Sequence, residues 1–102
     1  MISISPAELK QLIATDPSGI ELIDVREKDE HEAFNIGGQL IPFMEVIDNY
    51  KLIPKDKPVI LYCSKGVRSF LAIQRLEEKY HFENLYNLSG GLDAWKKEFG
   101  SK

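Results

Sequence analysis

The residues of this chain that are best suited to chemistry lie between Cys63 and Ser69. Cys63 is the only cysteine, and it follows the apolar run 59–62, whose composition and length predict a buried strand. Two cations, Lys65 and Arg68, follow within five residues. Because the thiolate is the reactive form of cysteine and nearby cations favour it, this pattern predicts a nucleophilic cysteine at a strand end.

The residues after the loop predict how the sulfur is held. Apolar positions in 70–76 recur at the spacing of a helix, and the first turn of a helix presents unpaired N–H groups. Gly66 lets the loop adopt conformations denied to other residues. We therefore expect backbone N–H groups of residues 64–69 to form an anion-binding nest, with a further hydrogen bond from the Ser69 hydroxyl.

Each of these side chains also has a purely structural interpretation. Cysteine is often a small, inert core residue. Arg68 suits a surface ion pair, Lys65 an exposed position and Ser69 a helix N-cap. The combination of a strand end, a glycine and two cations favours the nucleophile for Cys63, since ligands bind at the carboxyl ends of strands in open α/β sheets.

The elements that must position this loop alternate along the chain. The sequence predicts strands at 2–4, 20–25, 39–42, 59–62 and 85–88, with helices or short helical segments in the stretches between and after them. Such alternation predicts an α/β fold with a central, mostly parallel sheet of about five short strands and helices on both faces. Residues 1–102 are expected to form a single domain, because 102 residues is a common domain size.

Composition excludes several classes of protein. The 13 basic and 16 acidic residues give a net charge of −3 and are spread along the chain, so neither nucleic-acid nor membrane binding is expected. No segment approaches the roughly 20 apolar residues of a membrane span. The first residues lack the pattern of a signal peptide, and a lone cysteine cannot form an internal disulfide, so we expect a cytoplasmic location.

Other polar residues carry weaker signals. Asp24 and Arg26 lie at the end of a predicted strand, and we interpret them as a structural ion pair or loop anchor, with support of the pocket as the alternative. The charged run 26–32 is interpreted as a solvated loop and short helix. His31 and His81 lack ligand spacing, so no metal site is predicted.

Four segments together resemble one protein family. Residues 63–69 resemble the C-x-x-G-x-R-S active-site loop of rhodanese-like domains, and residues 22–27 its L-I-D-V-R-E signature. Residues 36–42 lie where the family usually has G-H-I-x-G-A-x-N-I-P, and 88–95 resemble its closing L-x-G-G-x-x-A-W. Their order and spacing match the family over nearly the whole chain, which is thus identified as a member of the single-domain rhodanese-like group.

The resemblance implies a sulfurtransferase without cofactor or metal. Cys63 would take a sulfane sulfur from a donor such as thiosulfate or a persulfide, hold it as a persulfide, and pass it to a thiol or cyanide. The loop residues that would bind the substrate are Ser64, Lys65, Gly66, Val67, Arg68 and Ser69. The expected partners are a small anionic sulfur donor and a thiol acceptor or sulfur-carrier protein.

The sequence departs from the family at two places. The usual histidine of G-H-I is absent, with Gly37 and Gly38 in that region. Ser64 stands where several thiosulfate-preferring members carry arginine, and one fewer cation weakens the case for thiosulfate as donor.

Two other functions stay open. The first is a persulfide carrier or protein-interaction module. It would receive its sulfur from a partner protein and show little turnover of small sulfur donors. The second is a small phosphatase or arsenate reductase, whose loops resemble C-x5-R. Four residues separate Cys63 from Arg68 here, and the shorter loop favours a single sulfur atom over a tetrahedral oxyanion.

Overall fold

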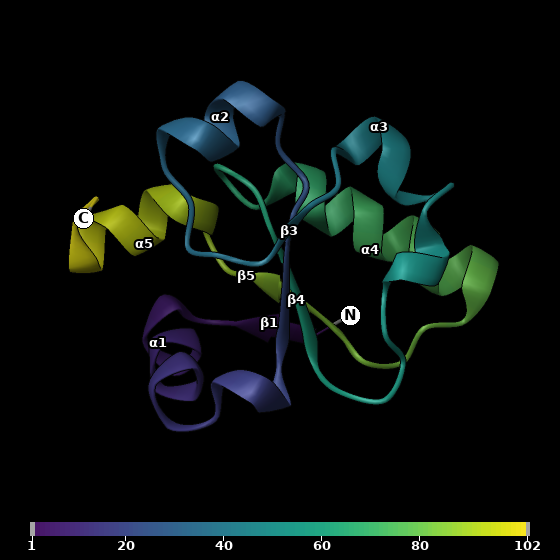
Figure 1. Cartoon of the computed structure of the whole chain (residues 1–102), viewed down its shortest axis with the longest axis horizontal. Coiled ribbons are helices and arrows are strands. Elements are labelled where there is room, and N and C mark those ends of the chain that lie inside the picture. Colours follow the sequence, from purple (N-terminus) through teal and green to yellow (C-terminus); the bar gives the residue numbers. More distant parts are fainter. Residues whose placement is uncertain (1, 102) are drawn as a thin grey trace.

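Five parallel strands form one sheet in the order β1-β5-β4-β2-β3 in the computed structural model, which describes residues 2–101 (Figure 1). The strands are β1 (Ile2–Ile4), β2 (Glu21–Asp24), β3 (Gln39–Leu40), β4 (Val59–Tyr62) and β5 (Leu85–Leu88). The helices are α1 (Pro6–Thr15), α2 (Lys28–Ala33), α3 (Phe43–Val46), α4 (Val67–Tyr80) and α5 (Gly91–Phe99), with 3-10 turns at Pro17–Gly19 and Tyr50–Leu52. The predicted α/β class and five strands are confirmed, and the sheet is parallel throughout.

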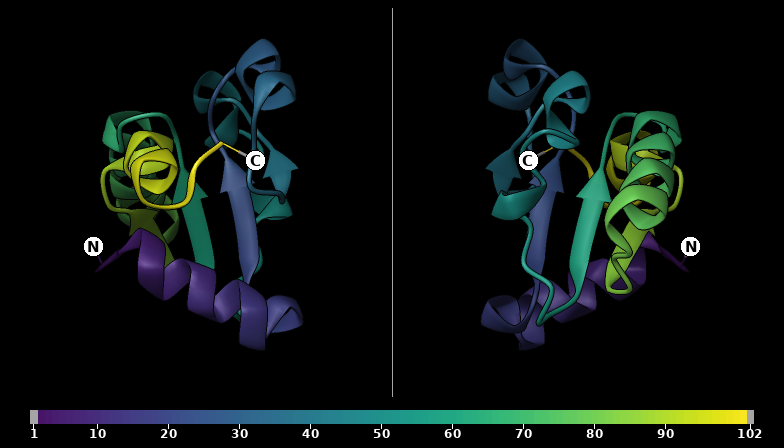
Figure 2. Two further views of the ribbon diagram at one scale, coloured as in Figure 1. Left: turned by 90° about the vertical axis from the view of Figure 1, so that its left-hand side faces the viewer. Right: turned by 90° about the vertical axis from the view of Figure 1, so that its right-hand side faces the viewer.

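The central strand β4 is buried on both faces, as its continuous apolar sequence predicts. Val59 and Leu61 pack on one face in a core cluster that includes residues of α3 and α4. Ile60 and Tyr62 pack on the other face with residues of α1 and α5. Helices thus cover both faces, and α2 lies beyond the carboxyl end of β2 (Figure 2). Within residues 2–101, no helix has the length and apolar character needed to cross a bilayer.

The helix that follows β4 starts earlier than its apolar pattern predicts. Helix α4 begins at Val67, directly after Gly66 with φ +90°, and ends at His81 in the left-handed region. Its buried face, which includes Ile73 and Leu76, packs against the β4 side of the core. As a result Arg68 lies in the first helical turn and not in the loop.

The first turn of α5 holds the loop after β4 in place. The backbone N–H of Leu92 donates to the Cys63 carbonyl at 2.9 Å, and that of Asp93 donates to the Ser64 carbonyl at 2.9 Å. Gly91 permits this approach, because a Cβ there would lie 2.5 Å from the Ser64 carbonyl oxygen. Gly91 also has φ +63°, which L side chains rarely adopt.

We predict that Gly91→Ala lowers the free energy of unfolding by about 3 kcal/mol, since the methyl group meets backbone atoms in a left-handed conformation. Urea unfolding followed by the fluorescence of the single tryptophan, Trp95, measures the change. Gly100→Ala is the matched control, because Gly100 has φ +83° but no atom within 4 Å of the added methyl. The control should cost less than Gly91→Ala, and equal costs would contradict the close-approach argument.

Candidate active site

Cys63 lies at the carboxyl end of β4, 1% exposed, and borders a cavity of about 170 Å³. Ser64, Lys65, Val67 and Arg68 line the rest of this cavity. The Cys63 sulfur accepts hydrogen bonds from two backbone N–H groups, that of Gly66 at 3.1 Å and that of Ser69 at 3.4 Å. N–H groups directed at a sulfur in this way can stabilise negative charge on it.

A hydrogen-bonded chain supports the loop from the neighbouring strand. Asn87 in β5 donates through Nδ2 to the Gly66 carbonyl at 3.2 Å, and its Oδ1 lies 2.5 Å from the Ser69 hydroxyl. The Ser69 hydroxyl is also 3.3 Å from the Cys63 sulfur. Because Oδ1 only accepts, the single hydroxyl hydrogen points to Asn87, and the Ser69 oxygen can accept from Cys63 only when the thiol is protonated. The expected donation from Ser69 to the sulfur would require that hydrogen to leave Asn87.

Sequence reasoning missed Asn87. A signal was present, because Asn87 is the polar residue in the otherwise apolar segment of β5 and is buried. A buried side-chain amide needs partners, so its position alone indicated a neighbouring polar loop.

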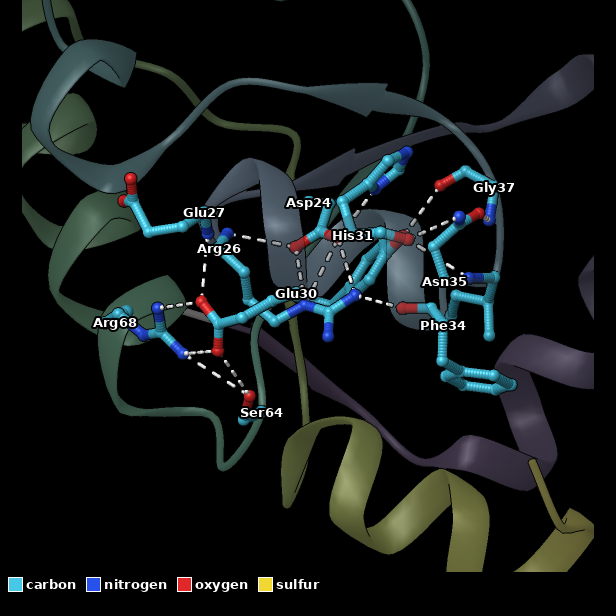
Figure 3. A network of polar contacts seen from close by, with 12 residues as sticks. Asp24, Arg26, Glu27, Glu30, His31, Phe34, Asn35, Gly37, Ser64 and Arg68 are labelled. Carbon is cyan, nitrogen blue, oxygen red and sulfur yellow. Dashed lines mark hydrogen bonds and ion pairs between the residues drawn. The ribbon is translucent and has the colours of Figure 1, made fainter.

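Arg68 does not present a free cation to the cavity (Figure 3). Its Nη1 and Nη2 donate to the two carboxylate oxygens of Glu30 at 2.9 Å and 3.0 Å, and Nη2 also donates to the Ser64 hydroxyl oxygen at 3.3 Å. The hydrogen bonds from Arg68, together with one from the Glu27 backbone N–H, lower the pKa of Glu30 to about 2. The same carboxylate raises the pKa of Arg68. Glu30 therefore stays ionised beside the cavity at neutral pH.

Two further residues that line the cavity, Lys65 and Val67, lie at the surface. The Lys65 side chain is 79% exposed, with Nζ 3.8 Å from the Asp93 carboxylate, a distance typical of a weak surface pair. Val67 is 62% exposed at the rim of the cavity. Both residues can meet an incoming molecule at the cavity.

Asp24 and Arg26 form a buried ion pair beside Glu30 (Figure 3). Neither residue lines the cavity. Arg26 Nη2 donates to Asp24 Oδ2 at 2.8 Å and to the Phe34 carbonyl at 2.5 Å, and His31 Nδ1 lies 2.8 Å from the same Asp24 oxygen. The pair thus ties β2 to the C-terminal part of α2, the helix that carries Glu30. This geometry fits the structural interpretation of Asp24 and Arg26.

The charged run 26–32 is not the solvated segment that the sequence suggested. Arg26 is 4% exposed, and Glu30 reaches across to Arg68 in α4. The prediction of a short helix is right, while the prediction of a solvated run is wrong at these two residues. A charged residue is expected at the surface unless it is paired. Here Arg26 is paired with Asp24 of β2, and Glu30 is paired with Arg68 of α4.

The segment at Gly37, where the family histidine would lie, is fixed by a tyrosine. The Tyr62 hydroxyl donates to the Gly37 carbonyl at 2.8 Å and accepts from the Ile36 N–H at 3.4 Å. Burial raises the pKa of Tyr62, so this phenol stays protonated. The polar contact links β4 to the segment before β3.

Two further features lie apart from the sulfur. Within residues 2–101, no three His, Cys, Asp or Glu side chains are grouped so as to hold a metal ion. A larger hollow of about 440 Å³ lies between α1, α5 and residues 34–36, lined mainly by apolar side chains, and none of the loop residues borders it. Of these two cavities, only the smaller one borders Cys63.

The family model of the rhodanese-like domain matches residues 5–98. The chain belongs to the rhodanese-like family. The match includes all four segments that carry the resemblance in the sequence, and it confirms that assignment.

Relatives and solved structures agree with this family. The chain is 41% identical over 83 residues to YqhL of Bacillus subtilis, covering 80% of this chain and 65% of YqhL, slightly less than two thirds of that relative. It is 36% identical over 78 residues to the thiosulfate sulfurtransferase GlpE of Coxiella burnetii, covering 76% of this chain and 72% of GlpE. A rhodanese-related protein of Thermoplasma volcanium has a similar structure, with TM-score 0.85, 28% identity and coverage of 97% and 94% of the two chains.

We predict that Asp24→Asn lowers the free energy of unfolding by about 3–5 kcal/mol, because it leaves the buried Arg26 guanidinium without its counter-charge. Urea unfolding measures the loss. The double variant Asp24→Asn/Arg26→Met removes the stranded cation and should be more stable than the single variant. A double variant that is equally unstable would contradict this origin of the loss.

The lowered pKa of Glu30 predicts a pH dependence of stability. The carboxyl titrates near 4.5 in the unfolded chain and at about 2 in the folded one, so its stabilising effect is complete above about pH 5 and is lost as the pH falls from there toward 2. The difference in unfolding free energy between the wild type and Glu30→Gln should therefore shrink over this range. A difference that stays constant down to pH 2 would show that the Glu30 carboxylate is not coupled to folding.

Proposed function

We propose that this protein is a sulfurtransferase that carries a sulfane sulfur as a persulfide on Cys63. The observation that supports this most is a single cysteine at a cavity of about 170 Å³, with two backbone N–H groups directed at its sulfur. The site has a nucleophile and groups that stabilise an anion on it, and persulfide formation needs no more from the protein.

The proposed reaction has two displacements. The Cys63 thiolate attacks the outer sulfur of thiosulfate, the S–S bond of the donor breaks, and sulfite leaves with the electron pair. Cyanide or a thiolate then attacks the outer sulfur of the Cys63 persulfide, and thiocyanate or a new persulfide leaves while the thiolate is regenerated. The Gly66 and Ser69 N–H groups stabilise the sulfur anion at both ends of the cycle.

The rim supports a second candidate, a persulfide carrier that receives its sulfur from a protein. Val67, which lines the cavity, is 62% exposed, and Phe70, in the same turn of α4, is 44% exposed. Exposed apolar side chains at a site entrance suit contact with a macromolecule. In either case the lone reactive thiol points to a reducing compartment, and we infer a cytoplasmic location.

Intact-protein mass spectrometry after brief incubation with thiosulfate tests the proposal. We expect a gain of one sulfur atom that is absent in Cys63→Ser and is reversed by cyanide with release of thiocyanate. No gain from thiosulfate but a gain from a persulfidated protein would favour the carrier. No gain from either donor would overturn the assignment of Cys63 as a sulfur carrier.

A further inference from the structure

Both cations that line the cavity at Cys63, Lys65 and Arg68, are paired with carboxylates. Arg68 is bound by Glu30 through two hydrogen bonds, and Lys65 lies 3.8 Å from Asp93. These four groups carry no net charge together. The cavity entrance is therefore far less positive than the loop sequence alone implies, and long-range attraction of a doubly charged anion is weak there.

The pair at Arg68 is the stronger of the two. The Arg68 and Glu30 side chains are only about one third exposed, at 35% and 32%, whereas Lys65 and Asp93 are 79% and 59% exposed. Ser64 closes the arrangement, since its hydroxyl lies within 3.4 Å of Glu30 Oε2 and accepts from Arg68 Nη2 (Figure 3). Surface pairs such as Lys65–Asp93 are readily exchanged for water, but a two-pronged, partly buried pair is retained.

The pairing also uses up most of the donors of Arg68. A guanidinium has five N–H donors, and Arg68 uses three of them for Glu30 and Ser64, which leaves two for a substrate. A sulfonate group of thiosulfate needs donors for several oxygens. A persulfide anion presents its charge on one terminal sulfur and needs fewer.

We infer that Glu30 is a specificity-determining residue, which neutralises Arg68 and so makes the site prefer sulfane donors with a single negative charge, such as a persulfide anion, over the thiosulfate dianion. This inference rests on the proposed function for its substrate class. The claim that Glu30 sets the charge at the cavity entrance does not depend on sulfur transfer. Glu30 acts on the donor through Arg68 and need not touch the reacting atoms.

Two donors separate the effect of charge from that of chemistry. Methanethiosulfonate has the same outer sulfur as thiosulfate, but a methyl group replaces one charged oxygen, so it carries one negative charge. Glu30→Gln should raise the ratio of kcat/KM for thiosulfate to that for methanethiosulfonate by about 3- to 10-fold, the effect of one unit charge several ångströms away. A fall or no change in this ratio would overturn the inference.

Glu32→Gln is the matched control. Glu32 lies on the same helix, is exposed and does not contact Arg68, so the variant makes the same chemical change and the same change in net charge. Its donor ratio should stay within about 1.5-fold of wild type, because exposed charges are screened by solvent and salt. An equal rise in both variants would attribute the effect to overall charge and overturn the role of Glu30.

Alkylation of Cys63 measures the entrance charge without any sulfur transfer. We would compare the rates with iodoacetate, an anion, and iodoacetamide, which is neutral. The rate with iodoacetate divided by the rate with iodoacetamide should rise about 3- to 10-fold in Glu30→Gln. The same ratio should fall in Arg68→Met, because that variant leaves the Glu30 carboxylate without its counter-charge. Each variant has its own expected direction of change in this ratio, so either variant tests the inference if the other fails to fold.

The two measurements distinguish the inference from the proposed function. If the alkylation ratio shifts as expected but neither donor leaves sulfur on Cys63, the sulfurtransferase proposal fails and the charge assignment to Glu30 stands. If sulfur is transferred but neither ratio responds to Glu30→Gln, the proposed function stands and the inference is wrong.

Discussion

The site depends on the contact between the first turn of α5 and the backbone after β4. Two N–H groups of that turn bind the carbonyls of Cys63 and Ser64, and this orients the chain as it leaves the sheet. The following N–H groups can then turn back to the Cys63 sulfur. Glycine at position 91 permits the approach, so these two backbone hydrogen bonds depend on the absence of a side chain there.

A second layer of support comes from the buried ion pair of Asp24 and Arg26. Its contacts with His31 and the Phe34 carbonyl hold α2 beyond the carboxyl end of β2. Since α2 carries Glu30, this buried pair also determines which charge lies next to Arg68. Asp24 and Arg26 thereby influence the electrostatics of the cavity at Cys63, although they do not line it.

The sequence predicted the fold and the local environment of Cys63 because both depend on short-range patterns. Apolar runs and a lone cysteine before a glycine are visible within a dozen residues, and parallel topology then brings the strand ends together. Glu30 and Asn87 were not predicted, because they reach the loop from elements 38 and 21 residues away from their contacts Arg68 and Gly66. Single-sequence patterns carry no information on such pairings, so the sequence allowed an ion pair for Arg68 but did not identify Glu30 as its partner.

The structure separates the groups that stabilise the sulfur anion from those that attract a substrate. N–H dipoles act on the Cys63 sulfur at 3.1 and 3.4 Å, and their effect falls off steeply with distance. Full charges act over a longer range, but at this entrance each cation faces an acid. A thiolate can therefore be stabilised in the cavity without making the surface strongly attractive to anions. Nucleophile reactivity and donor choice can then change independently, the first through the loop backbone and the second through side chains such as Glu30.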